Sequence, residues 1–214
     1  MIVLGLDTCL AACSVAVLDG DRVLAHASEA MARGHQERLA PMAQAVMAEA
    51  GLVFARLDRI GATVGPGSFT GLRVGVAFAK GLASALEIPA VGVGSLEALA
   101  ASAPGLTAAV IDARRDQVYL QVFEAGEALM APDVLPIEIA AARLAELARG
   151  RPLTLVGSGG PLLADAVLGA TIQTPGGCDA RLVARLAASR APAPIRPLYL
   201  RAPDAKLPGG KLPA

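Results

Sequence analysis

The chain has 214 residues, which is enough for one large domain or two domains of about 100 residues each. Its 19 Lys and Arg residues balance its 19 Asp and Glu residues, so it lacks the positive excess typical of a protein that binds nucleic acid alone. Hydrophobic residues make up 54% of the chain and aromatic residues only 3%, so aliphatic side chains and alanine must build the core.

Several absences favour a cytoplasmic protein without a membrane span. Segment 1–7 has no basic leader and reaches Asp7 too early for a signal peptide. No stretch of about 18 apolar residues is free of Gly, Pro and charge. The odd number of cysteines, Cys9, Cys13 and Cys178, and the lack of a Cys-x-x-Cys pair predict small buried residues rather than a metal site.

Apolar runs and turn residues predict that strands and helices alternate in the first half of the chain. The expected elements are an antiparallel meander at 2–6, 14–18 and 22–26, a helix at 39–50, a strand at 60–64, a helix at 72–86, a strand at 90–93 and a helix capped by Ser95. We expect the first helix to begin just before Pro41, because a proline in the first turn loses no intrahelical hydrogen bond.

A similar opening recurs in the second half. An apolar run ends at Asp112 as the first one ends at Asp7, and an alternating strand follows each. Further elements are expected in the second half: a helix at 137–149, a strand at 153–156, a short helix, and a helix at 180–189 before a Pro-rich tail that we expect to lie over the surface. The sequence therefore predicts two α/β halves, 1–103 and 104–214, that face each other across a cleft.

The strongest local motif joins the 60–64 strand to the next helix through a glycine-rich turn. Its residues are Gly65, Pro66, Gly67, Ser68, Phe69, Thr70, Gly71, Leu72 and Arg73. A helix N-terminus with unpaired N–H groups can hold an anion, but the spacing matches neither a Walker loop nor a dinucleotide-binding fingerprint. The alternative is a tight turn in which Ser68 or Thr70 caps the helix.

Asp7, with Thr8 beside it, and Asp112 stand where actin-like kinases place carboxylates that hold a hydrated metal beside phosphates. The segment after Asp7 lacks the glycine that lets a phosphate approach the backbone in those enzymes. Three interpretations stay open: a working triphosphatase site, a residual nucleotide pocket, and aspartates that only cap turns.

Other catalytic arrangements are poorly supported. The two histidines, His26 and His35, are nine residues apart and cannot form a chelating pair on one helix face, and we expect His35 to be structural at the start of its helix. No serine lies in a Gly-x-Ser-x-Gly elbow. The sequence therefore argues against a catalytic metal and against triad hydrolysis.

The predicted helix at 72–86 is apolar on nearly every side. Small residues recur at Gly71, Gly75, Ala79 and Ala83, and such a stripe lets another backbone come close. The sheet of the same half can cover one face of this helix, and a second face is covered either by the 39–50 helix or by a partner chain. The apolar composition of the whole chain favours a partner slightly.

The chain resembles the TsaB family, also called YeaZ, from end to end. The segments that carry the resemblance are Leu4–Thr8, Gly34–His35, Leu39–Pro41, Gly65–Arg73, Gly94–Ala100, Asp112–Arg114 with Tyr119, and Pro197–Arg201. The resemblance implies a duplicated actin-like fold of the heat-shock-ATPase superclass (ASKHA), made of two RNase H-like halves.

The same resemblance implies a noncatalytic subunit in tRNA modification. In the family, TsaB pairs with and stabilises its paralogue TsaD, which transfers threonylcarbamoyl from threonylcarbamoyl-AMP to N6 of adenosine 37 in tRNAs that read codons beginning with A. The ATPase TsaE joins them, and tRNA is reached through the complex. We expect no tightly bound cofactor, although ATP or ADP can be present in the complex, and a homodimer when the partner is missing.

The family interface uses the two helices of the first half. The candidate contact residues here are Leu39, Met42, Ala43, Val46, Gly75, Phe78, Ala79 and Leu82. Two competing functions are an independent ASKHA-type kinase or ATPase that uses Asp7 and Asp112, and a glycoprotease-like peptidase. The first predicts tight Mg-ATP binding and the second predicts bound zinc.

Overall fold

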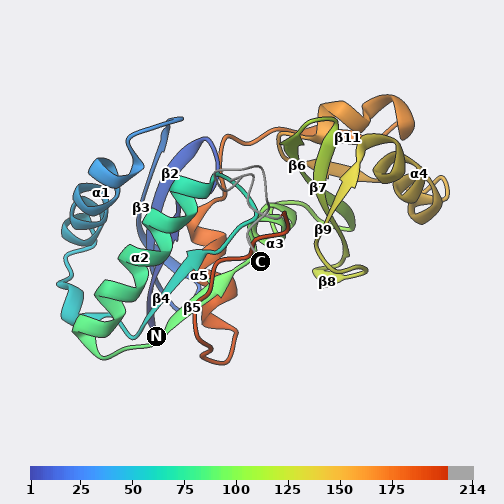
Figure 1. Ribbon diagram of the computed structural model, residues 1–214. Coiled ribbons are helices and arrows are strands. Elements are labelled where there is room, and N and C mark those ends of the chain that lie inside the picture. Colours follow the sequence, from blue (N-terminus) through green and yellow to red (C-terminus); the bar gives the residue numbers. More distant parts are fainter. Residues whose placement is uncertain (202–214) are drawn as a thin grey trace, which may run out of the picture.

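Two mixed β-sheets, one in each half of the chain, form the frame of the molecule (Figure 1). The computed structural model describes residues 1–201; the end of the predicted Pro-rich tail, 202–214, lies outside the described residues. Within 1–201, no helix combines the length and apolar character needed to cross a membrane.

The first sheet confirms the predicted meander. Its strands are β1 (Ile2–Asp7), β2 (Ala12–Asp19), β3 (Arg22–Ala30), β4 (Arg59–Thr63) and β5 (Ala90–Val93), in the order β3-β2-β1-β4-β5. β1, β2 and β3 pair antiparallel, whereas β4 pairs parallel with both β1 and β5. The ends of β1 and β4 therefore meet at one edge of the sheet, where the motif loop begins.

Helices cover both faces of this sheet. α1 (His35–Glu49) and α2 (Phe69–Leu86) pack against one face, with the 3₁₀ turn η1 (Phe54–Arg56) between them in sequence (Figure 1). The prediction that α1 begins just before Pro41 is wrong, because Pro41 lies inside the helix. The Pro41 side chain is exposed, so the backbone groups that lose a hydrogen bond there lie on the solvent side, where water can pair them.

α3 (Ser95–Ala100) also begins differently from the prediction. Its N-cap is Gly94, and Ser95 is the first helical residue, with no side-chain cap. The Ser95 N–H instead donates to the Gly65 carbonyl at 2.8 Å, which ties the start of α3 to the motif loop. The cap prediction is therefore wrong, because a tertiary hydrogen bond sets the position of this residue.

The second half repeats the same order in reduced form. Its elements are β6 (Leu106–Arg114), β7 (Gln117–Glu124), β8 (Glu127–Ala128), β9 (Asp133–Pro136), α4 (Ile137–Ala148), β10 (Thr154–Val156), the 3₁₀ helix η2 (Gly160–Ala166), β11 (Thr171–Gln173) and α5 (Ala180–Ala188). β6 and β7 pair antiparallel and β10 pairs parallel with β6, as β1, β2 and β4 do. The recurrence of the hairpin and of the parallel strand agrees with two related halves.

The two halves exchange helices, so a boundary between 103 and 104 separates the sheets but not the cores. α5, from the end of the chain, packs against β1, β2 and β4 of the first sheet, on the face opposite α1 and α2 (Figure 1). α3, from the first half, packs against β6 and β7 of the second sheet. Ile195 in the tail also joins the core of the first half. The prediction that 104–214 forms its own half is therefore wrong for α5 and for Ile195 of the tail.

Two glycines let α5 lie directly on the first sheet. A Cβ on Gly5 of β1 would stand 2.8 Å from the Ala184 backbone nitrogen, and a Cβ on Gly61 of β4 would stand 2.5 Å from the Ala187 Cβ. Such distances are shorter than carbon packing allows. Small residues on both surfaces therefore set how closely the helix approaches the strands.

We expect Gly61→Ala to lower the free energy of unfolding by about 1–3 kcal/mol, the usual cost of overpacking a filled core. The added methyl would meet the Ala187 Cβ and, at 3.1 Å, the Val183 carbonyl oxygen. Urea denaturation measures the difference. Gly81→Ala in the exposed part of α2 is the matched control, because a Cβ there meets no atom within 4 Å. It should stabilise the protein by about 0.5–1 kcal/mol. Equal effects of the two changes would contradict this account of the α5 contact.

Candidate functional site

The motif loop connects β4 to α2 and is fastened to the turn between β1 and β2. The Ser68 N–H donates to the Cys9 carbonyl at 2.7 Å. A Cβ on Gly67 would collide with the Cys9 backbone carbonyl oxygen, so only glycine permits this approach. The Ser68 side chain accepts a hydrogen bond from the Gly71 N–H at 3.3 Å and is the N-cap of α2. The capping interpretation of this motif is therefore confirmed for Ser68.

Asp7 is buried, and both oxygens of its carboxyl group accept hydrogen bonds from the chain itself. Oδ1 accepts from the Thr63 hydroxyl at 2.7 Å and from the Cys9 N–H at 3.1 Å, and Oδ2 accepts from the Cys178 N–H at 2.8 Å. Burial raises the pKa of Asp7 above its usual value, although these three hydrogen bonds and His35 act in the opposite direction. The carboxyl group thus joins β1, β4 and the segment before α5.

Thr8 is also turned inward. Its hydroxyl donates to the Gly71 carbonyl at 2.7 Å and is fully buried. Gly75 packs against the same hydroxyl, because a Cβ there would stand 2.5 Å from Thr8 Oγ1. Thr8 therefore holds α2 against the end of β1 and does not face a cleft.

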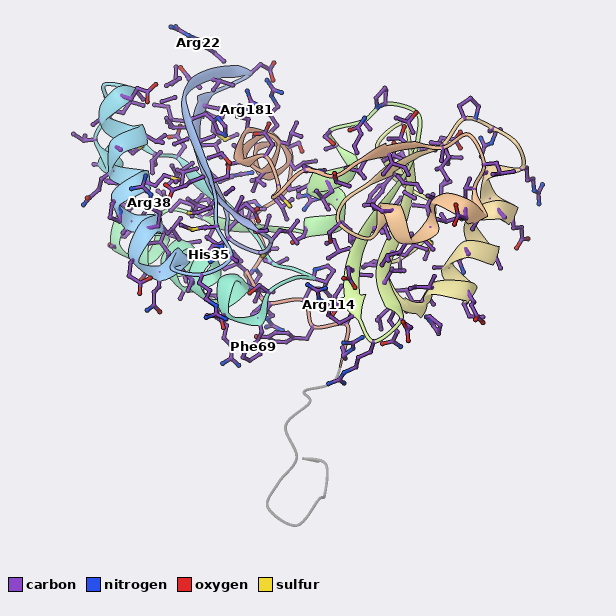
Figure 2. All side chains as sticks on the ribbon, turned by 90° about the horizontal axis from the view of Figure 1, so that it is seen from above. Arg22, His35, Arg38, Phe69, Arg114 and Arg181 are labelled. Carbon is purple, nitrogen blue, oxygen red and sulfur yellow. The ribbon has the colours of Figure 1, made fainter. Side chains whose placement is uncertain are left out.

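Asp112, in contrast, lines a cavity of about 520 Å³ between the two halves. Its Oδ1 accepts from the Arg114 backbone N–H at 2.7 Å, and its Oδ2 pairs with Arg114 Nη1 at 2.9 Å. The Asp112 N–H donates to the Ser158 hydroxyl at 3.1 Å. Figure 2 shows Arg114 at the junction of the halves. This cavity between the halves is lined by Asp112 but not by Asp7, so the two predicted aspartates do not share one site.

These residues do not fit a metal-bound nucleotide. Both oxygens of Asp7 are occupied by donors of the chain itself. The turn that follows, Cys9 to Ala11, lines the cavity between the halves and contains no glycine that would let a phosphate approach the backbone. Across the part of the chain that the structure describes, no group of three or more His, Cys, Asp and Glu side chains could hold a metal ion.

The three cysteines are buried and unpaired, as predicted. Burial raises the pKa of the Cys9 thiol to about 12 and that of Cys13 to about 11, and in each case the charge of Asp7 adds to the rise. The pKa of Cys178 is also well above its usual value, again mainly because of burial. Thiols with such pKa values stay protonated and unreactive at neutral pH.

Comparisons with known proteins identify the family. A sequence model described as TsaD, tRNA N6-adenosine threonylcarbamoyltransferase, matches residues 23–155. An uncharacterized protein of Mycobacterium tuberculosis is 39% identical over 175 residues, which cover 82% of this chain and 79% of that protein. The tRNA threonylcarbamoyladenosine biosynthesis protein TsaB of Escherichia coli is 38% identical over 132 residues, which cover 59% of this chain and 57% of that protein.

Comparison with solved structures points to the same family. YeaZ from Pseudomonas aeruginosa is similar with a TM-score of 0.78 and 32% identity, over 87% of this chain and 90% of that one. The chain belongs to the TsaB/YeaZ family. Both the resemblance to this family and the fold class that the resemblance implied are thereby confirmed.

The TsaB/YeaZ chain also shares its fold with more distant actin-like proteins. The activator of 2-hydroxyisocaproyl-CoA dehydratase from Clostridium difficile, solved with bound ADPNP, is similar with a TM-score of 0.52 over 87% of this chain and 94% of that one. At 11% identity this similarity shows the fold alone. It confirms the duplicated ASKHA architecture.

Most of the predicted partner-contact residues of this TsaB/YeaZ chain face its own core. Six of the eight are buried: Leu39, Met42, Ala43, Val46, Gly75 and Ala79. The prediction that these six form a partner surface is wrong, because the helical periodicity that selected them marks the face turned toward the sheet. Phe78 and Leu82 are only partly buried and remain candidates. The small-residue stripe is likewise internal, since Gly71 and Gly75 pack against Thr8.

A surface cluster at the start of α2 was not predicted as a site. The Arg73 guanidinium lies 3.8 Å from the centre of the Phe69 ring, and Tyr199 from the tail stands 5.7 Å from the same ring. Arg73 Nε donates to the Tyr199 hydroxyl at 3.3 Å. The sequence motifs contain all three residues, but 126 positions separate Arg73 from Tyr199, so no local pattern indicates that they meet. The cluster attaches the tail of this family member to α2.

The carboxyl group of Asp7 should make the stability of this TsaB/YeaZ chain depend on pH. Because burial raises its pKa above the usual 3.8, the native state binds the proton more tightly than the unfolded chain. The free energy of unfolding should therefore fall as the pH rises from the usual pKa through the raised one. The Asn side chain of Asp7→Asn does not titrate. The free energy of unfolding of the wild type minus that of Asp7→Asn should therefore become smaller as the pH rises from the usual pKa to the raised one.

Urea unfolding at several values between about pH 4 and pH 8 measures this difference. Asp165→Asn, which changes an exposed carboxyl group in η2, controls for the general effect of removing a charge. A difference that instead grows with pH would mean that the Asp7 hydrogen bonds hold the group ionised, contrary to the raised pKa.

Proposed function

We propose that this chain is a cytoplasmic, noncatalytic subunit of the complex that transfers threonylcarbamoyl from threonylcarbamoyl-AMP to N6 of adenosine 37 in tRNA. Membership of the TsaB/YeaZ family supports the pathway. The noncatalytic role is supported chiefly by one observation: Asp7, the carboxylate best placed in sequence to hold a metal, is buried with both oxygens occupied by the chain's own donors.

The proposal includes no tightly bound cofactor in the isolated chain. ATP or ADP enters with the complex, where another subunit supplies the groups that hold its phosphates. An independent kinase or a metallopeptidase would need a free carboxylate or a chelating pair, and the environment of Asp7 and the separation of the two histidines favour neither.

The partners in this proposal are the paralogue TsaD and the ATPase TsaE, with tRNA bound through the assembled complex. The catalytic metal and the transfer chemistry belong to TsaD. This chain stabilises and orients TsaD, and forms a homodimer through the same surface when TsaD is absent.

An apolar strip on α2 supports a helical docking surface. Residues spaced by three and four along the outer side of the helix are all small or apolar: Val74, Ala77, Phe78, Gly81, Leu82 and Ala85. We name these six residues the α2 outer strip. Ala77, Gly81 and Ala85 are exposed, and the larger three are partly buried. Small residues beside partly exposed large ones let a second helix pack closely.

We expect Ala77→Glu to weaken binding of TsaD by at least about tenfold, because a charge would be buried in an apolar contact without a partner. Because Ala77 is exposed, this substitution should leave the fold intact. Isothermal titration calorimetry with purified TsaD measures the affinity, and circular dichroism checks folding. Ala142→Glu, on the exposed side of α4, is the matched control and should bind normally.

Normal TsaD binding by Ala77→Glu would contradict the docking surface. Gly75→Leu is unsuitable as a test, because any side chain there would collide with Thr8 inside the protein. The noncatalytic role has a separate test: the purified chain alone should neither hydrolyse ATP nor cleave peptides. Tight Mg-ATP binding that Asp7→Ala removes would instead favour the kinase.

A further inference from the structure

Two exposed aromatic rings lie next to each other at the start of α2. The chain contains only four Phe and two Tyr residues. Even so, Phe69 is 54% exposed and Tyr199 is 49% exposed, and their ring centres are 5.7 Å apart. A pair of aromatic rings that stays outside the core of a chain so poor in aromatic residues indicates a surface that binds another molecule.

Hydrogen bonds on both sides of Tyr199 already attach the tail without the help of the rings. The Leu198 N–H donates to the Val64 carbonyl at 2.7 Å, and Arg201 Nη1 donates to the Ala113 carbonyl at 2.8 Å. The first bond fastens the tail to the first half of the chain and the second bond fastens it to the other half. The exposed surface of the two rings is therefore available to a ligand.

Arginines from three elements surround the rings. The Arg73 guanidinium of α2 lies 3.8 Å from the centre of the Phe69 ring. Arg73 Nε donates to the Tyr199 hydroxyl, and its two Nη groups have no acceptor within the described residues. Arg201 of the tail bonds to the residue before Arg114, at the end of β6. Three guanidinium groups thus gather on one surface with the two rings.

Arg114 lies on the same side as the rings. It lines the cavity between the halves together with Ser68, the residue before Phe69, and Figure 2 shows Arg114 and Phe69 along the same edge of the molecule. The Arg114 side chain is 85% exposed, although one of its nitrogens pairs with Asp112. We name Phe69, Arg73, Arg114, Tyr199 and Arg201 the arginine–aromatic surface.

The charged residues of this surface give it a positive excess, although the chain as a whole is neutral. The turn between β6 and β7 holds two acidic and two basic side chains, whose charges cancel: Asp112, Arg114, Arg115 and Asp116. Arg73 and Arg201 add two positive charges beside this turn. The arginine–aromatic surface therefore suits a ligand that carries negative charge and flat rings together.

We propose that the arginine–aromatic surface binds an unpaired stretch of RNA, in which a base stacks on Phe69 while Arg73 and Arg114 hold the phosphates. Unpaired bases stack on aromatic rings and on guanidinium planes, and arginine forms paired hydrogen bonds with phosphate oxygens. An apolar helix of the kind that suits the α2 outer strip would leave these arginines without partners. This inference rests on the proposed function, and it adds that the chain itself contacts the RNA.

Fluorescence anisotropy with labelled oligouridine tests the proposal, on the purified full chain alone and on the chain with TsaD. We expect Phe69→Ala to weaken binding by about tenfold, because stacking of a base is lost. The salt dependence of binding should stay the same in this variant, since no charge changes. Arg114→Gln should weaken binding and lower the slope of log Kd against log salt concentration by about 0.7, the value for one phosphate contact with a single strand.

Two conservative changes separate stacking from simple apolar contact. Phe69→Tyr keeps an aromatic ring and should bind as the wild type does, whereas Phe69→Leu keeps an apolar side chain without a ring and should bind about as weakly as Phe69→Ala. Phe69→Ala should not change the binding of an RNA duplex of the same length, because the bases of a duplex are already stacked on each other.

Matched controls change exposed residues elsewhere on the molecule. Leu168→Ala shortens a side chain that is 92% exposed in the second half. Arg22→Gln removes an arginine on the opposite side of the molecule from Phe69 in Figure 2. Both variants should bind oligouridine as the wild type does.

Absence of saturable oligouridine binding, or equal affinity of Phe69→Ala and the wild type, would overturn the proposal. Calorimetry with TsaD keeps this outcome distinct from a failure of the proposed function. If Phe69→Ala loses TsaD but not RNA, the surface is a protein contact, and the RNA inference is wrong while the proposed function stands. If the wild type does not bind TsaD, the proposed function fails, and RNA binding by the chain alone still decides this inference.

Discussion

The carboxyl group of Asp7 is the contact on which the first half of this protein depends. It lies at the end of β1 and accepts hydrogen bonds from Cys9, Thr63 and Cys178, which belong to the β1–β2 turn, to β4 and to the segment before α5. Residues 7 and 178 are thus held together by one buried side chain. A buried acidic group is costly unless it is paired or protonated, and here three donors and a raised pKa together reduce that cost. The carboxyl group that the sequence marked as a candidate metal ligand is therefore a structural joint.

Glycine and alanine determine how the other segments gather around this joint. α5 reaches β1 and β4 because Gly5 and Gly61 leave room for its backbone, and α2 approaches the end of β1 because Gly71 and Gly75 leave room for Thr8. Close approach of this kind explains how a chain with so few aromatic residues fills its interior. The same small residues that look in sequence like a surface for a partner therefore act inside the chain. Of the α2 outer strip, Ala77, Gly81 and Ala85 are exposed, whereas its three larger residues also pack against the core.

The sequence predicted the parts of the fold that local patterns control. The apolar runs and the turn residues between them predicted the meander of the first sheet, and an apolar run that ends at Asp112, as the first one ends at Asp7, predicted two related halves. The motif loop predicted a helix cap at Ser68 or Thr70. Prediction from the sequence failed where segments far apart in the chain determine the structure. No local signal places α5 on the first sheet or brings Tyr199 to Arg73, and periodicity alone marks an apolar face without saying whether the sheet or another protein covers it. Asp7 was recognised as special from its position, but its three donors come from separate parts of the chain, so only the structure distinguishes a joint from a metal ligand.

The helix exchange between the halves has a consequence for synthesis on the ribosome. The face of the first sheet that α5 covers includes Val3, Ala16 and Leu18, which are apolar and fully shielded in the finished protein. While the chain grows, this face has no cover until residues 180–188 have left the exit tunnel, long after the strands beneath it. Nascent chains with such bare sheet faces are natural clients of ribosome-associated chaperones. Packing of α5 is thus a late step of folding during translation, and loss of the C-terminal 35 residues would expose this face of the first sheet even though all five of its strands are intact.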